Sequence, residues 1–185
     1  MLLVRGRHEH RVREVVVEIE VVVVERVVLL GDYDWVLVDS GAGISAQTVA
    51  LAAACERVLL VTTPDVTALT DAYAFLKVLL QRDPRSNPCF VVNRAASADE
   101  AADVAERLRG AARKFLNRDV PCLGMLSDDR AVVRCVNLRA PVVRREPDSR
   151  FAADLRGLAG LLVHDGEKGP SLGLGERLAR LVSVP

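Results

Sequence analysis

The chain has 185 residues, of which half are apolar, and its 25 basic and 25 acidic residues give a net charge of zero. This length suits one domain with a sizeable core, and the balanced charge gives no indication of a nucleic-acid partner or an acidic substrate. A membrane span needs about 20 nearly uncharged residues. The one long apolar stretch, Val15 to Leu30, is interrupted by Glu18, Glu20, Glu25 and Arg26.

The first 30 residues do not follow the pattern of the rest of the chain. Valine dominates Val15–Val24, with glutamates interspersed. β-branched residues favour a strand there, although an unstable helix also fits the pattern. The opening residues lack the apolar core of a signal peptide, so we expect a cytoplasmic protein.

Short, continuously apolar runs mark four strands that are covered on both faces, as in a parallel sheet. They are Trp35–Val38, Val58–Thr62, Cys89–Asn93 and Pro121–Leu126. Helical patterns follow each of them. These cover Ser45–Cys55, Val66–Gln81, Ala98–Asn117, Arg130–Leu138 and Arg150–Val163. Alternating strands and helices predict an α/β fold, a doubly wound and mostly parallel sheet between two helical layers.

The helix over Ala98–Asn117 has the clearest local signals. Ser97 followed by Glu100 is a capping-box pattern. One helical stripe is expected to face the core, made of Val104, Leu108, Ala111, Ala112 and Phe115. Beyond it, residues 164–185 read as a linker with a short amphipathic tail.

The four cysteines are too widely and irregularly spaced for a metal site or a disulfide framework. Cys89 and Cys122 lie in apolar stretches, so we expect buried free thiols there; the other two are Cys55 and Cys135.

The most informative segment is D-W-V-L-V-D-S-G-A-G, residues 34–43. Its apolar run ends at Asp39, and ligands of parallel α/β sheets bind just beyond the carboxyl ends of strands. Asp39 would there be placed to hold a magnesium ion, and Gly43 would let the backbone approach a phosphate. No glycine-rich loop ending in Gly-Lys-Ser/Thr occurs in the sequence, although phosphate cradles of this type need one.

Several motifs in a fixed order resemble the MinD/ParA class of deviant P-loop ATPases. They are D-Y-D-W-V-L-V-D-S-G-A-G-I-S, R-V-L-L-V-T-T-P-D-V-T-A-L-T-D-A-Y, F-V-V-N-R-A and L-G-M-L-S-D-D-R-A-V. The segment T-T-P-D-V-T-A-L-T-D-A-Y is most similar to the subfamily that sets flagellar number and placement in bacteria. The resemblance covers about Gly31–Leu162, which implies a P-loop NTPase-like α/β domain over residues 31–163.

The resemblance implies roles for individual residues. Asp39 matches the switch II aspartate, which holds magnesium through water and positions the attacking water, so it is the catalytic and metal candidate. Gly43 matches the glycine near the γ-phosphate. Asn93, followed by Arg94, matches the asparagine that reads the adenine edge. Asp129 matches the residue beside the base, where the family usually has Pro-x-Asp and this chain has Ser127-Asp128-Asp129. The implied cofactor is Mg-ATP.

The sequence departs from the family at its start. The opening strand, the lysine-containing loop and the switch I aspartate are absent, and Lys168 lies in the tail and cannot replace that lysine. The resemblance therefore implies a fold truncated at its N-terminus, unless Val15–Val24 replaces the missing central strand. Because phosphoryl transfer depends on positioning and charge stabilisation, we expect this chain alone neither to bind nor to hydrolyse ATP.

Three functions stay open. The resemblance implies a nucleotide-gated homodimer that regulates flagellar assembly, with peripheral contact to the inner membrane through Leu174–Val182 and no nucleic-acid partner. A non-enzymatic scaffold that keeps the partner-binding surface is the first alternative. A receiver domain phosphorylated on Asp39, with Thr62 at the next strand end, is the second. It lacks the expected lysine because Asn93 and Arg94 stand in that position.

Overall fold

The structure, a computed structural model, describes residues 2–5, 17–18 and 35–165. These residues divide into two units that we describe separately. The first comprises described residues of Met1–Leu60 and Tyr73–Cys89, and the second those of Val61–Ala72 and Phe90–Lys168. The tail segment Leu174–Val182 lies outside the described residues. None of the helices within residues 35–165 combines the length and the hydropathy of a membrane-spanning helix.

The strands of the first unit follow the spatial order β2 (Val17–Glu18), β3 (Trp35–Asp39), β1 (Leu2–Arg5), β4 (Arg57–Thr62). β1 is antiparallel to both neighbours, with Leu3 opposite Leu37 and Leu2 opposite Val58. β2 runs parallel to β3.

This arrangement corrects the expectation for Val15–Val24. Of that segment, the described residues Val17 and Glu18 form an edge strand, while β1 lies between β3 and β4. The physical reason is charge. Leu2, Leu3 and Val4 suit a position between two strands, whereas the glutamates of Val15–Val24 suit an edge, where charged side chains reach water.

The core of the first unit lies where α1 (Ala46–Ala54) and the second half of α2 (Val66–Arg82) pack with β3 and β4. Ser45 caps α1, because its Oγ accepts the Thr48 N–H at 3.1 Å. The buried cluster contains Val38, Ala52, Ala53, Ala54, Cys55, Val58 and Leu79. The small alanines of α1 let the helix approach the sheet closely.

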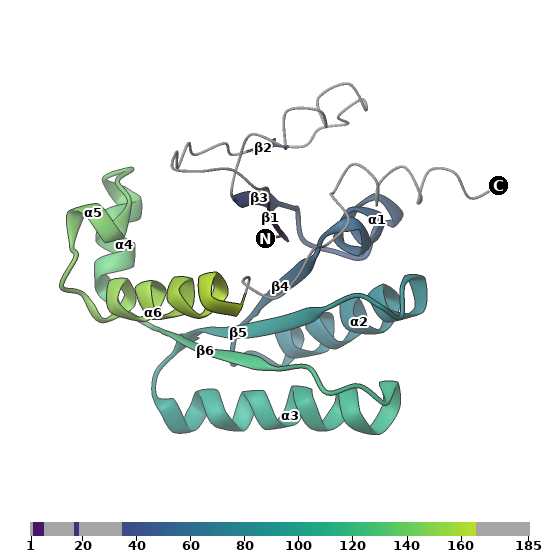
Figure 1. Ribbon diagram of the computed structural model, residues 1–185. Coiled ribbons are helices and arrows are strands. Elements are labelled where there is room, and N and C mark those ends of the chain that lie inside the picture. The colour runs from purple at the N-terminus through teal and green to yellow at the C-terminus, as the bar shows by residue number, and fades with distance from the viewer. Residues whose placement is uncertain (1, 6–16, 19–34, 166–185) are drawn as a thin grey trace. The chain divides into compact units, whose positions relative to one another are not determined.

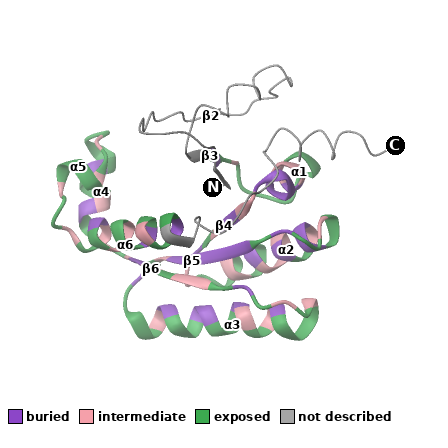
Figure 2. Cartoon of the chain, viewed as in Figure 1, coloured by how far each residue is buried: buried purple, intermediate pink, exposed green. Residues whose placement is uncertain are grey.

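The second unit is built on β5 (Pro88–Ala95) and β6 (Cys122–Ser127), which pair in parallel with Asn93 opposite Leu126. α3 (Ala98–Leu116) and α6 (Arg150–Asp165) lie on opposite sides of these strands (Figure 1). β5 is almost wholly buried (Figure 2). This layering agrees with the predicted α/β fold.

The predicted cap of α3 is confirmed. Ser97 Oγ accepts the Glu100 N–H at 3.1 Å, and Glu100 accepts the Ala96 N–H at 2.7 Å. The predicted stripe is wrong at its end, because Phe115 is 65 % exposed. Cys122 is also only partly buried, whereas Cys55, Cys89 and Cys135 are buried thiols.

Two short helices complete the second unit. α4 (Arg130–Asn137) ends one residue before its predicted end, and α5 (Val142–Arg145) was not expected. α4 contacts α5, and α5 contacts α6. Pro141 stands at the N-cap of α5, where a missing N–H costs nothing.

Candidate functional site

The turn after β3 presents an accessible carboxylate. Asp39 is the last residue of β3, and its side chain is exposed and makes no hydrogen bond or ion pair among the described residues. Gly43 follows with φ +111°, a conformation that side chains strain. A Cβ placed there would meet no atom within 4 Å. The turn is therefore shaped by its backbone and open to an approaching group.

A magnesium ion at Asp39 would need most of its ligands from elsewhere. Within the described residues, no three His, Cys, Asp or Glu side chains group in a way that could hold a metal ion. Mg²⁺ is commonly bound through one or two carboxylates, with waters and phosphate oxygens completing six ligands. The turn thus fits the protein's share of such a site.

In the second unit, Asn93 and Arg94 lie at the carboxyl end of β5. Asn93 Oδ1 accepts the Arg94 N–H at 2.9 Å, and Arg94 has a positive φ of 56° at an irregularity in the β5–β6 pairing. This bulge turns Arg94 outward, where its Nε lies 4.0 Å from Asp128 Oδ1. Asp128 N–H in turn donates to the Ala95 carbonyl at 3.0 Å.

Ser127, at the end of β6, is fixed by a residue that sequence reasoning missed. Its N–H and its hydroxyl both donate to Asp154 Oδ2 of α6, at 2.9 Å and 2.6 Å. The related family usually has proline here, and proline has neither donor. The replacement of proline by serine was the signal, since a partly buried serine after a strand needs an acceptor.

Asp129 acts as a double cap. Its Oδ1 accepts the Ala131 N–H at 2.8 Å and its Oδ2 accepts the Phe151 N–H at 3.3 Å, so one carboxylate joins the first turns of α4 and α6. These backbone donors, Ala131 first, hold the pKa of Asp129 below its ordinary value. Both oxygens of this predicted site residue are therefore already engaged.

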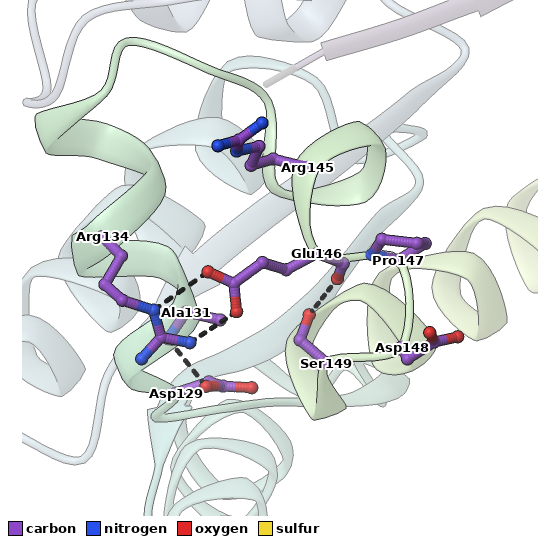
Figure 3. Close-up of a pocket in the computed structure, with 8 residues that line it drawn as sticks. All are labelled: Asp129, Ala131, Arg134, Arg145, Glu146, Pro147, Asp148 and Ser149. Carbon is purple, nitrogen blue, oxygen red and sulfur yellow. Dashed lines mark hydrogen bonds and ion pairs between the residues drawn. The ribbon is translucent and has the colours of Figure 1, made fainter.

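A hollow of about 450 Å³ lies beside Asp129, between α4 and the start of α6 (Figure 3). Arg134 and Glu146 form a two-bond ion pair on its wall, including Nε to Oε1 at 2.9 Å. The hydrogen bonds from Arg134 lower the pKa of Glu146 and raise that of Arg134. Its other lining residues are Ala131, Arg145, Pro147, Asp148 and Ser149. No sequence motif had indicated this hollow.

The structure thus brings together the predicted residues within each unit. Asp39 and Gly43 share one turn of the first unit, whereas Asn93, Arg94 and Asp129 gather at the ends of β5 and β6 in the second. What sequence reasoning missed lies around the second set, in Asp154 and in the Arg134–Glu146 pair.

Comparisons with known proteins agree with this arrangement. A family model described as "Cellulose biosynthesis protein BcsQ" matches residues 4–162. Flagellum site-determining protein YlxH of Helicobacter pylori is 32% identical over 83% of this chain and 53% of its own length. Antiactivator FleN of Pseudomonas aeruginosa is 28% identical over 68% of this chain and 45% of its own. The chain therefore spans about half the length of these curated relatives.

A solved structure shows the same fold. The septum site-determining protein MinD of Pyrococcus horikoshii, solved with Mg-ADP, superposes with a TM-score of 0.61 at 24% identity. The match covers 78% of this chain and 56% of that chain. It confirms the α/β architecture of a parallel sheet flanked by helices, with the antiparallel β1 as a local departure.

Proposed function

Because the chain belongs to the BcsQ family, within the MinD/ParA class of P-loop ATPases, we propose that it is a nucleotide-dependent regulator of bacterial flagellar number and placement. The observation that carries this proposal is the likeness to two proteins named for flagellar roles. The motifs of Gly31–Leu162 support it, in particular T-A-L-T-D-A-Y.

Within this function, the two sets of site residues have separate tasks. Asp39 holds magnesium through water and positions the attacking water, and Gly43 lets the backbone approach the terminal phosphate. Asn93, Arg94 and Asp129 line the base side. The exposed, unpaired Asp39 and the positive φ of Gly43 support the first set. The engagement of both Asp129 oxygens indicates that this residue acts by shaping the loop.

Bound nucleotide would act by holding two copies of the protein together, as the family resemblance implies. The Mg-ADP held by MinD of Pyrococcus horikoshii is consistent with Mg-ATP as the cofactor. This sequence supplies no Gly-Lys-Ser/Thr loop, so we propose that these residues alone do not hydrolyse ATP. Flagellar assembly proteins are the proposed partners, at the cytoplasmic side of the inner membrane.

A non-enzymatic scaffold is the second candidate. Two observations favour it: the missing phosphate cradle, and a base-side loop whose carboxylates Asp129 and Asp154 are bonded within the protein. The receiver alternative loses its support, because the chain has the fold of MinD and Thr62 is only 2% exposed.

The experiment is an in-frame deletion of the gene in its own organism, followed by counting and locating flagella by electron microscopy. We expect altered flagellar number or position, with cell length and cellulose content unchanged. Restoring the gene with Asp39→Ala separates the two candidates: a nucleotide-dependent regulator fails to complement, and a scaffold complements. Unchanged flagella together with altered cell length or cellulose would refute the proposal.

A further inference from the structure

Helices α4 and α5 expose a continuous apolar strip. Val133 and Val136 are three residues apart, so they lie on one face of α4. They are 61% and 67% exposed, and Leu138 and Val143 follow at 61% and 37%. The opposite face of α4 is buried through Ala131 and Cys135. Single exposed apolar residues are ordinary, but four within eleven positions, on two contacting helices, form a patch (Figure 2).

Arginines surround this strip. No aspartate or glutamate occurs from position 130 to 145, whereas five arginines do. Arg134 is neutralised by Glu146. The other four are exposed and form no ion pair with any part of the chain that the structure describes; they are Arg130, Arg139, Arg144 and Arg145. We call these four arginines and the four apolar residues the α4–α5 surface.

The hollow beside Asp129 adjoins this surface. Arg145 lines it, close to the Arg134–Glu146 pair (Figure 3). Because Glu146 already satisfies Arg134, Arg145 is the lining cation left without an ion-pair partner among the described residues. A carboxylate entering the hollow would find that guanidinium.

From this combination, we infer that the α4–α5 surface binds an acidic amphipathic segment of a partner protein. Guanidinium groups bind carboxylates in two-bond geometry. Valine side chains are stiff, so they lose little freedom when covered. Apolar side chains of the segment cover Val133 and Val136, and its carboxylates meet the surrounding arginines. The inference does not rest on the flagellar role.

Other occupants fit these residues less well. A nucleic-acid backbone would pair with the arginines, but it offers nothing apolar to cover the valine strip. Helices that insert into membranes bring aromatic or long apolar side chains, and the α4–α5 surface has no aromatic residue and a single leucine. An acidic helix matches both the charge and the apolar spacing.

The test uses the full chain and a fluorescent synthetic helix of about four turns, with leucine at i, i+3, i+4 and i+7 and glutamate elsewhere. Fluorescence anisotropy should show binding in the micromolar range that weakens as salt is raised. A peptide of the same composition with its leucine spacing scrambled should not bind. A third peptide, with lysine in place of glutamate, should not bind either.

Variants locate the contact. The double variants Val133→Ser/Val136→Ser and Arg139→Glu/Arg144→Glu should each weaken binding by about tenfold or more. Matched controls stand elsewhere in the second unit, where Leu161 of α6 is half exposed and Arg107 of α3 is exposed. Leu161→Ser and Arg107→Glu should bind like the original chain. Circular dichroism confirms that each variant is folded.

Four results would overturn the inference. The first is failure of the acidic helix to bind, or equal binding of the scrambled peptide. The second is Val133-dependent binding to vesicles of phosphatidylcholine and phosphatidylglycerol, or arginine-dependent binding to duplex DNA, in place of peptide binding. The third is self-association that the valine substitutions abolish, which would assign the surface to a second copy. The fourth is peptide binding seen only after deletion of Ser171–Pro185, which would assign it to the chain's own tail.

Discussion

The turn after β3 and the loops after β5 and β6 all follow the carboxyl ends of strands, but they are built in opposite ways. In the first, the Asp39 side chain makes no hydrogen bond or ion pair within the described residues, and the turn depends on the backbone of Gly43. In the second, the polar side chains bond within the protein, through Ser127 to Asp154 and through Asp129 to α4 and α6.

This difference teaches which residues are maintained for the fold and which are free for a ligand. A side chain that holds two helices together would be needed in a protein that binds nothing. An exposed carboxylate after a buried strand contributes little to stability, so its presence needs another reason. Substitutions in the two regions should therefore separate stability from binding.

The largest effect is expected at Asp154. Replacing it by alanine leaves the Ser127 N–H and hydroxyl without their shared acceptor, which should lower the free energy of unfolding by about 1–3 kcal/mol. Asp154→Asn keeps an acceptor oxygen and should lose less. Urea denaturation measures both. Equal stability of Asp154→Ala and the original chain would remove the bonded loop from the comparison.

Gly43→Ala should follow, with a loss of about 1–2 kcal/mol, because an L side chain is strained at φ +111°. The space around it is open, so no clash adds to this cost. Gly110→Ala, in the interior of α3, is the matched control and should be neutral or stabilising. If both glycine substitutions behave alike in thermal unfolding, the turn does not depend on its backbone conformation.

Acidification should weaken the second unit specifically. The pKa values of Asp129 and Glu146 are lowered from ordinary values of 3.8 and 4.5, by backbone donors and by Arg134 respectively. Groups with lowered pKa stabilise the fold above those ordinary values, and the contribution is lost as pH falls through the folded-state pKa. Asp129→Asn should flatten the pH dependence of unfolding below about pH 4. An unchanged slope would contradict the double cap.

Asp39→Ala should have the smallest effect on stability, within about 0.5 kcal/mol, because the side chain is exposed and unpaired among the described residues. Thermal unfolding of the variant beside Asp154→Ala gives the direct contrast. A large loss at Asp39 would mean that this carboxylate holds the fold and is not reserved for a ligand.

Most of the fold could be predicted from apolar patterning. The four buried runs became β3 to β6 with ends shifted by one or two residues, and Ser45 and Ser97 marked helix starts that the structure confirms. Local rules worked because hydrophobic period and side-chain caps act within one element.

Long-range pairing was less accessible. Leu2–Arg5 is too short to identify as a strand, and its position between β3 and β4 depends on contacts with residues about thirty or more positions away. The Ser127–Asp154 bond likewise spans 27 positions. Phe115 fits the helical stripe but lies one turn beyond the last buried residue, Ala112, and is exposed. Spacing alone does not say where a helix outruns its sheet.

The account's central claim is that this chain keeps the base-side framework and the metal-side aspartate of a nucleotide site without the phosphate-binding loop. A thermal-shift titration of the full chain with Mg-ATP tests it most directly. Ligand at a hundredfold excess over its dissociation constant would stabilise the fold by about 2.7 kcal/mol. The account predicts no shift with Mg-ATP. A clear shift that Asp39→Ala abolishes would contradict it.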